Sequence, residues 1–311
     1  MDLSIVIVSF NTRELTLNCL KSVMQFLAGK LSFEILVIDN NSGDGSPEAI
    51  REYAGGGDAI KVIDAGANVG FAKANNIGIT LAKGKQVLLL NSDTYLIDDS
   101  LVSAMEYLDK TSNVFGCGCT LLNADKTPGI SYGVFPELFT VCRELLTGRF
   151  ARLRAMAPRR PGFVYDIDLP CGAFFLIKKT LLDRVGPMDE HFFMYCEETD
   201  LAKRAWKAGY RIVYFGPTRV VHLGGQSGVK KTESASGGRS SFDLRKIFYQ
   251  SWSYYLRKHH SRVHASAIKT MLLLYFQAQY LIFSAVHNEI ARDFHRKEVA
   301  SLKSGWNTTE H

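Results

Sequence analysis

The 311-residue sequence lacks the features that mark non-globular and exported proteins. It has only 26 glycines and 8 prolines, and 46% of its residues are hydrophobic, which excludes a collagen-like repeat and a disordered chain. No basic segment precedes the apolar run that begins at Leu3, so we expect no secretory signal and a cytoplasmic protein. The six cysteines are scattered, and Cys117-Gly-Cys119 lacks the second pair that a zinc site would need.

Two common nucleotide-binding motifs are also missing. No expected strand is followed by G-x-G-x-x-G or by G-x-x-x-x-G-K-[ST]. Their absence disfavours a dinucleotide site of the Rossmann type and a P-loop. A sheet that binds a nucleotide without either motif remains open.

The net charge of +6 is concentrated at one end of the chain. Residues 239–311 hold 11 Lys or Arg against 5 Asp or Glu, whereas the first 238 residues balance to zero. This distribution predicts a neutral domain over 1–238 and a basic C-terminal region over 239–311. A spread-out basic excess fits an anionic membrane surface better than a nucleic acid.

Runs rich in Val, Ile and Leu alternate with helical patterns in the first part of the chain. Strands are expected at 3–9, 33–39, 60–63 and 86–91, and the alternation predicts a mostly parallel α/β sheet with right-handed crossovers. Such sheets bind ligands at the carboxyl ends of their strands. Asn11, Asp39 and Asp93 are therefore expected at one edge. A later strand is expected over 168–177.

Three acids, Glu197, Glu198 and Asp200, begin a helical pattern directly after the aromatic run Phe192–Tyr195. Acids in a first helical turn can simply complement the helix dipole. An apolar wall beside them favours an acid–base site, because such a wall raises the pKa of a carboxyl. His222 stands at a strand end before a Gly-Gly turn, where either a structural role or a ligand role fits.

Two segments outside this core leave alternatives open. Six arginines crowd 136–161, which is typical of a solvated helical face or of a cover over an anionic substrate. An amphipathic helix with an aromatic face is expected over 242–258. The apolar stretch 268–286 favours an interfacial or oligomer-packing helix over a core hairpin, and either over a membrane span.

The sequence resembles family 2 glycosyltransferases, which are inverting enzymes of the GT-A fold, and in particular bacterial rhamnosyltransferases that extend lipid-linked glycans. The matching motifs occur in family order over about residues 1–230. They are VIVSFN, VIDNNSGDGS, NVGFAKANNIGI, LLLNSD, PCGAFFLIKK, FFMYCEETDLAKRAWKAGY and VVHLGGQS. The resemblance implies a GT-A catalytic domain with a Rossmann-like, mostly parallel sheet over 1–238, followed by a membrane-associating helical appendage.

The resemblance also implies a donor site at the carboxyl edge of the sheet. Asp39 would accept a hydrogen bond from the imide N–H of uracil or thymine, and the loop after the first strand would line the base. The residues expected at the nucleotide-sugar site are Ser9, Phe10, Asn11, Asp39, Asn41, Asn68, Gly70, Phe71, Asn75, Asn91, Ser92 and Asp93.

Asn91-Ser92-Asp93 stands where the family carries Asp-x-Asp. Asp93 matches the second acid, which holds a divalent metal, whereas Asn91 replaces the first acid and removes one charge. With His222 and phosphate oxygens, Asp93 implies a site for Mg²⁺ or Mn²⁺.

The Glu-Asp pair of the family stands here as Glu197-Glu198. Glu198 is expected to be the general base that deprotonates the acceptor hydroxyl, and Glu197 is the fallback. Asp200, the third candidate, and Arg204 match supports of that helix and are interpreted as structural or as acceptor contacts. A single displacement would invert the anomeric centre.

The predicted function is therefore transfer of a sugar, L-rhamnose from dTDP-rhamnose, to a lipid-linked saccharide in cell-envelope polysaccharide synthesis. The donor would be dTDP- or UDP-linked, and the enzyme would lie on the inner face of the cytoplasmic membrane, where its C-terminal helices could join it into a homo-oligomer. One rival is a sugar-phosphate nucleotidyltransferase, which would need a glycine-rich basic loop in place of residues 9–13. The other is a catalytically silent scaffold, because Asn91 and Glu198 depart from the fullest motif.

Overall fold

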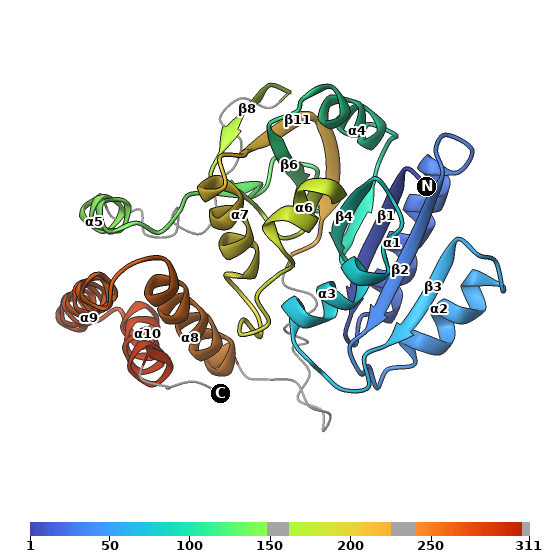
Figure 1. Cartoon of the computed structure of the whole chain (residues 1–311). Coiled ribbons are helices and arrows are strands. Elements are labelled where there is room, and N and C mark those ends of the chain that lie inside the picture. The colour runs from blue at the N-terminus through green and yellow to red at the C-terminus, as the bar shows by residue number, and fades with distance from the viewer. Residues whose placement is uncertain (148–161, 225–240, 307–311) are drawn as a thin grey trace. The chain divides into compact units, whose positions relative to one another are not determined.

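The computed structural model of the chain describes residues 1–147, 162–224 and 241–306 (Figure 1). The chain divides into two units. Unit 1 is Met1–Phe135 with Arg154–Glu190 and Glu197–Ser227, and unit 2 is Pro136–Leu153 with His191–Cys196 and Gly228–His311. The domain boundary expected after residue 238 lies outside the described residues, as do residues 148–161 of the arginine-rich segment.

Unit 1 is built on a sheet that has nine strands among the described residues. Its order is β3-β2-β1-β4-β10-β6-β11-β5, with β8 beside β11. The strands are β1 (Leu3–Ser9), β2 (Phe33–Asp39), β3 (Ile60–Asp64), β4 (Gln86–Asn91), β5 (Thr94–Leu96), β6 (Val114–Leu122), β8 (Val164–Ile167), β10 (Phe174–Lys178) and β11 (Arg211–His222). The first four run parallel, which confirms the prediction made from their alternation with helices.

The remaining elements of unit 1 are its helices and a small two-stranded sheet. The helices are α1 (Arg13–Leu27), α2 (Ser46–Ala54), α3 (Phe71–Leu81), α4 (Leu101–Lys110), α6 (Lys179–Val185) and α7 (Glu197–Lys207). The small sheet pairs β7 (Tyr132–Gly133) with β9 (Leu169–Pro170).

Helices cover both faces of the parallel part of the sheet. Alternate residues of β1 point to opposite faces, and Ile5 and Ile7 join a buried core with Leu20 and other residues of α1. On the other face α3 packs against β1 and β2. A methyl group at Gly78 of α3 would come within 2.3 Å of Val6, so this helix lies close to the sheet only because position 78 has no side chain.

The expected strand over 168–177 is interrupted. It forms β9 and β10, with Cys171–Ala173 as an irregular loop between them. β10 then runs antiparallel to both β4 and β6. The chain reaches β10 from this loop and not through a helical crossover, which is the connection that a parallel strand requires.

Unit 2 contains α5 (Leu138–Leu146), α8 (Ser241–His259), α9 (Arg262–Ala285) and α10 (Glu289–Trp306). The two helices expected from the sequence are confirmed as α8 and α9. Tyr249, Trp252 and Tyr255 of α8 are buried, and Trp306 of α10 packs edge-on against Trp252. Among the described residues, no helix has the length and hydrophobicity that crossing a membrane would require.

Candidate active site

The carboxyl ends of β1, β2 and β4 lie at the same level of the sheet. Ser9 pairs with Asp39 across β1 and β2, and Val8 pairs with Asn91 across β1 and β4. The loops that follow these strands therefore begin side by side, as the sequence predicts. They carry most of the residues expected to bind a nucleotide sugar.

Asp39 ends β2 and is almost completely buried. Its Oδ2 accepts a hydrogen bond of 2.9 Å from the backbone N–H of Ser42. Its Oδ1 is buried and accepts none from the described residues. A buried carboxylate oxygen is costly unless it is hydrogen-bonded, so Oδ1 is a suitable acceptor for an N–H group of a ligand.

Asn11 ties the loop after β1 to the loop after β2. Its backbone adopts the left-handed conformation, with φ of 54°. Its N–H donates to Ser42 Oγ at 2.9 Å, and its Oδ1 accepts from the N–H of Gly43 at 2.8 Å. Asn11 thus shapes the wall beside Asp39 through the backbone of its neighbours.

Asn40 holds the loop before α3 and was not among the residues expected from the sequence. Its Nδ2 donates to Asn68 Oδ1 at 3.0 Å, and its Oδ1 accepts from the N–H of Val69 at 2.9 Å. Asn68 Oδ1 also accepts from Gly70, whose φ of 88° suits glycine. The signal for Asn40 was its place directly after Asp39 at the end of a strand.

Other expected donor residues lie at the same edge in different roles. Asn75 is buried and its side chain donates to the carbonyl of Phe71, one turn earlier in α3. Asn41 is exposed and adopts the left-handed conformation, with φ of 67°, and Phe10 is half-buried. The structure therefore places Phe10, Asn41 and Phe71 nearer to solvent than Asn75.

A cluster of hydroxyl groups joins the ends of β1 and β4. The hydroxyl of Thr12 lies 3.3 Å from that of Ser9 and donates to Ser92 Oγ at 3.1 Å. Thr12 stands at the N-cap of α1, but its side chain makes no capping hydrogen bond. This hydroxyl instead fixes Ser92, and with it the position of Asp93.

Asp93 and His222 form the pair that the sequence predicts as metal ligands. His222 Nε2 lies 3.3 Å from Asp93 Oδ1, close to the ~3 Å that separates adjacent ligand atoms around an octahedral ion with bonds of ~2.1 Å. Both carboxylate oxygens of Asp93 are buried and accept no hydrogen bond from the described residues. A buried carboxylate of this kind fits a cation. The side-chain oxygen of Asn91 is also buried without a partner among these residues.

Glu197 and Glu198 begin α7 as a carboxyl pair, in which Glu197 is buried and Glu198 is partly buried with its Oε2 shielded from solvent. Burial raises the pKa of Glu197 well above its ordinary value, and the charge of Glu198 raises it further. Burial also raises the pKa of Glu198, while a hydrogen bond with Glu197 lowers it. Glu197 therefore keeps the proton and donates it in a hydrogen bond, which leaves Glu198 as the member of the pair that ionises first.

The loop between β9 and β10 lies close to both groups of carboxylates. A methyl group at Gly172 would lie 3.8 Å from the carboxyl carbon of Glu198. Burial raises the pKa of Cys171 to about 11, and the charges of Glu198 and Asp93 add to this effect. The N–H of Asn91 also donates to the carbonyl of Ala173 at 3.1 Å, so this loop lies both against Glu198 and at the end of β4, just before Asp93.

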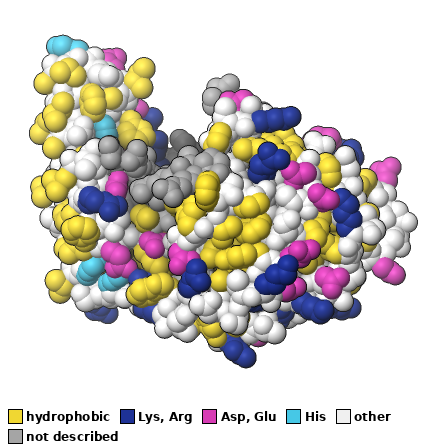
Figure 2. Space-filling model, turned by 90° about the horizontal axis from the view of Figure 1, so that it is seen from above, with side chains coloured by type: hydrophobic (Ala, Val, Ile, Leu, Met, Phe, Trp, Pro, Cys, Tyr) yellow, Lys and Arg dark blue, Asp and Glu magenta, His cyan; other side chains and the backbone are white. Residues whose placement is uncertain are grey.

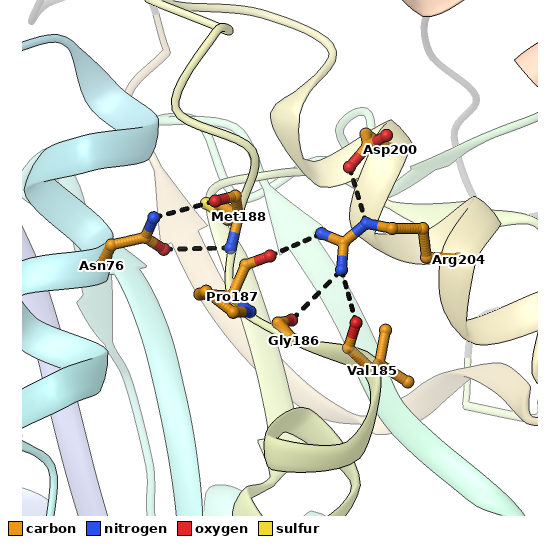
Figure 3. A network of polar contacts seen from close by, with 7 residues as sticks. All are labelled: Asn76, Val185, Gly186, Pro187, Met188, Asp200 and Arg204. Carbon is orange, nitrogen blue, oxygen red and sulfur yellow. Dashed lines mark hydrogen bonds and ion pairs between the residues drawn. The ribbon is translucent and has the colours of Figure 1, made fainter. Parts of the chain in front are cut away.

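Asp200 and Arg204, both in α7, connect this helix to the segment Val185–Pro187 (Figure 3). Arg204 Nε donates to Asp200 Oδ2 at 2.8 Å, and the rest of the guanidinium donates to three backbone carbonyls, those of Val185, Gly186 and Pro187. Asp200 is completely buried. These contacts give Asp200 a positioning role in unit 1.

Asn76 of α3 binds the next residue of this segment, Met188 (Figure 3). Asn76 Nδ2 donates to the carbonyl of Met188 at 2.8 Å, and its Oδ1 accepts from the N–H of Met188 at 2.9 Å. Asn76 Nδ2 also lies 3.0 Å from Glu190 Oε1. Residues 185–188 are thus fixed between α3 and α7, and α7 carries the carboxyl pair.

Comparison with solved structures defines the class of this fold. The mannosyltransferase PcManGT from Pyrobaculum calidifontis, solved with GDP-Man and Mn²⁺, matches 97% of this chain and 85% of its own chain, with a TM-score of 0.59 and 16% identity. At this identity the likeness shows the fold alone. The fold is that of a GT-A glycosyltransferase.

Sequence comparison gives the family. Residues 4–185 match the model described as Glycosyl transferase family 2, and the chain belongs to this family of glycosyltransferases. It is 26% identical over 261 residues to the low-salt glycan biosynthesis hexosyltransferase Agl10 of Haloferax volcanii. The aligned region covers 82% of this chain and 76% of Agl10. It is 24% identical over 219 residues to the N-acetylglucosaminyl-diphospho-decaprenol L-rhamnosyltransferase of Mycobacterium tuberculosis. This alignment covers 63% of the present chain and 68% of the relative.

Proposed function

We propose that this glycosyltransferase moves L-rhamnose from dTDP-rhamnose to a lipid-linked saccharide acceptor and inverts the anomeric centre. The name of the mycobacterial relative supports both the sugar and the lipid diphosphate acceptor. Asp39 supports a dTDP or UDP donor, because its buried Oδ1 can accept the imide N–H that uracil and thymine share.

The donor would bind along the carboxyl edge of the sheet. Asn11 and Asn40 position the loops on either side of Asp39, and Ser92 positions Asp93 at the end of β4. Asp93 and His222 would hold Mg²⁺ or Mn²⁺. A divalent metal at this pair would neutralise the charge that develops on the leaving nucleoside diphosphate.

Glu198 would remove the proton from the acceptor hydroxyl as that oxygen attacks the anomeric carbon. The C–O bond to the sugar forms as the bond to the diphosphate breaks, and the proton passes to Glu198. Glu197 would keep Glu198 oriented by donating a hydrogen bond to it. Attack from the face opposite the leaving group gives inversion.

The observation that carries this proposal is the nearness of Asp93 and Glu198. Asp93 beside His222 suits a cation and Glu198 suits a proton, and the loop Cys171–Ala173 lies against Glu198 and is hydrogen-bonded to the end of β4. An enzyme that must stabilise a leaving diphosphate and deprotonate a hydroxyl needs both groups within one site.

Thermal unfolding with nucleotides tests the donor site. The purified protein is heated with dTDP, UDP, GDP or CMP, each with and without Mn²⁺. A ligand at 100 times its dissociation constant adds about 2.7 kcal/mol of stability, so we expect a metal-dependent rise in Tm with dTDP and UDP only. Asp93→Asn should remove the metal dependence, whereas Asp58→Asn, at an exposed site, should not.

If no nucleotide raised the Tm, the result would favour the catalytically silent scaffold, which Asn91 and Glu198 support because both depart from the fullest motif. Transfer is then measured directly with dTDP-rhamnose and a lipid diphosphate N-acetylglucosamine acceptor. A nucleotide response without turnover on this acceptor would overturn the acceptor assignment and leave the donor site standing.

We also propose that unit 2 attaches the enzyme to an anionic membrane surface. Apolar side chains gather with scattered basic ones at the left of Figure 2, where Figure 1 shows α5 and α9. The exposed ones in α9, α10 and the link between them are Val263, Leu274, Leu281, Ile282, Val286, Ile290 and Phe294. Apolar side chains on a basic region bind anionic bilayers through both burial and charge.

A further inference from the structure

Three metal-ligating side chains meet in unit 2, outside the site described above. Glu137 directly precedes α5, His260 directly follows α8, and His264 lies in the first turn of α9. Each offers a ligand atom, and these atoms all lie within 4.8 Å of one another. This group is distinct from the pair Asp93 and His222 described above.

The separation between His260 and Glu137 suits a tetrahedral ion. His260 Nε2 lies 3.4 Å from Glu137 Oε2. Two ligand atoms of a tetrahedral Zn²⁺ with bonds of 2.0–2.1 Å are ~3.3–3.4 Å apart. The two histidines are separated by three residues, a spacing common among zinc ligands, and their rings stack with centroids 4.4 Å apart.

His264 distinguishes a metal site from a simple ion pair. Its Nε2 is buried and has no hydrogen-bond partner among the residues that the structure describes. A contact between His260 and Glu137 alone would leave this nitrogen without a hydrogen bond, which is rare for a buried polar atom. An ion shared by all three side chains would satisfy it.

We propose that Glu137, His260 and His264 bind a divalent transition-metal ion of the Zn²⁺ type. The ion would accept one nitrogen from each imidazole and one carboxylate oxygen, and a water molecule would complete the tetrahedron. It would join the start of α5 to the junction of α8 and α9, two segments more than 100 residues apart in the sequence. This metal would stabilise unit 2.

The test uses the full-length chain carrying Asp93→Asn, which removes the metal-binding carboxylate of the donor site. The protein is stripped with EDTA and dialysed against Zn²⁺ alone, and bound zinc is measured by elemental analysis together with the Tm. Two variants remove ligands, His264→Gln and Glu137→Gln. The matched control is His287→Asn, because His287 is exposed and its φ of 54° is one that asparagine tolerates.

We expect the parent and His287→Asn to bind a single Zn²⁺ and to gain in Tm with it. His264→Gln and Glu137→Gln should lower the affinity at least ~10–100-fold, the loss that even an outer-shell partner causes, and should lose the Tm gain. Equal zinc binding by the parent and both ligand variants would overturn the proposal, and so would a parent that binds none. If His264→Gln does not fold by circular dichroism, Glu137→Gln decides, because Glu137 is only half-buried.

Discussion

Replacing Glu198 by glutamine should stop transfer and leave donor binding unchanged. Glutamine has nearly the same shape, so it fits beside Gly172, but it cannot accept the proton of the acceptor hydroxyl. Loss of a general base costs ~10²–10⁴ in rate, which is about 2.7–5.4 kcal/mol in the activation barrier at 1.36 kcal/mol per tenfold. The assay compares single-turnover transfer with Tm shifts by dTDP and Mn²⁺.

Glu197→Gln is the matched control for this prediction. Its amide N–H can still donate to the carboxylate of Glu198, so most of the activity should remain. Burial raises the pKa of Glu198, so the rate should rise with pH along a limb that lies above the ordinary carboxyl value. If Glu197→Gln abolished transfer and Glu198→Gln did not, Glu197 would be the base and the reasoning would be refuted.

The same pair predicts a pH-dependent change in stability. A carboxyl whose pKa is raised by folding stabilises the fold below its unfolded pKa, and this contribution is lost as pH rises through the folded pKa. Glu198→Gln cannot ionise. Its Tm should therefore match that of the wild type near pH 4 and exceed it at pH 8. A variant less stable than the wild type at pH 8 would contradict this prediction, because it would show that the ionised carboxylate of Glu198 stabilises the fold.

Two further predictions concern support and location. Arg204→Ala should lower the free energy of unfolding by ~3–5 kcal/mol in urea, because it breaks the ion pair with the buried carboxylate of Asp200; a loss below ~1 kcal/mol would contradict this. Leu281→Asp combined with Ile282→Asp should reduce flotation with anionic vesicles, while Leu81→Asp, at an exposed site of unit 1, should not. Equal flotation of all three proteins would exclude α9 as the membrane contact.

Much of the fold could be predicted because its local signals agree with its packing. β1, β2 and β4 are largely apolar runs buried on both faces, and turn residues follow each of them, so their position and extent were readable. The direction of β10 could not be predicted, because it depends on the loop Cys171–Ala173, which the continuous apolar pattern over 168–177 conceals. Helix α10 was not predicted either. It carries seven charged side chains, and its burial depends on α8 and α9.

For the candidate site, the sequence indicated which residues lie at the ends of strands, but not which side chains are hydrogen-bonded to one another. A residue at the end of a parallel strand is placed by the strand, so Asp39 and Asp93 were readable from the pattern alone. Asn40 and Thr12 were not, because their roles are hydrogen bonds to residues 28 and 80 positions away. Such long-range contacts leave no local period in the sequence. The group Glu137, His260 and His264 was missed for the same reason.

The candidate site also explains why so much of unit 1 is devoted to holding loops in place. Asp39, Asp93 and Glu197 are buried, and each buried carboxylate destabilises the ligand-free fold unless a proton, a hydrogen bond or a cation compensates it. In the proposed function, the donor and the metal would supply partners to Asp39 and Asp93, so their binding would relieve a cost already present in the ligand-free protein. The hydroxyl of Thr12 holds Ser92, which precedes Asp93, and Asn40, which follows Asp39, is hydrogen-bonded to Asn68. The hydrogen bonds that hold the loops and the burial of the carboxylates therefore serve the same end. Charged groups stabilise a transition state most when the surrounding structure holds them in place before the reaction.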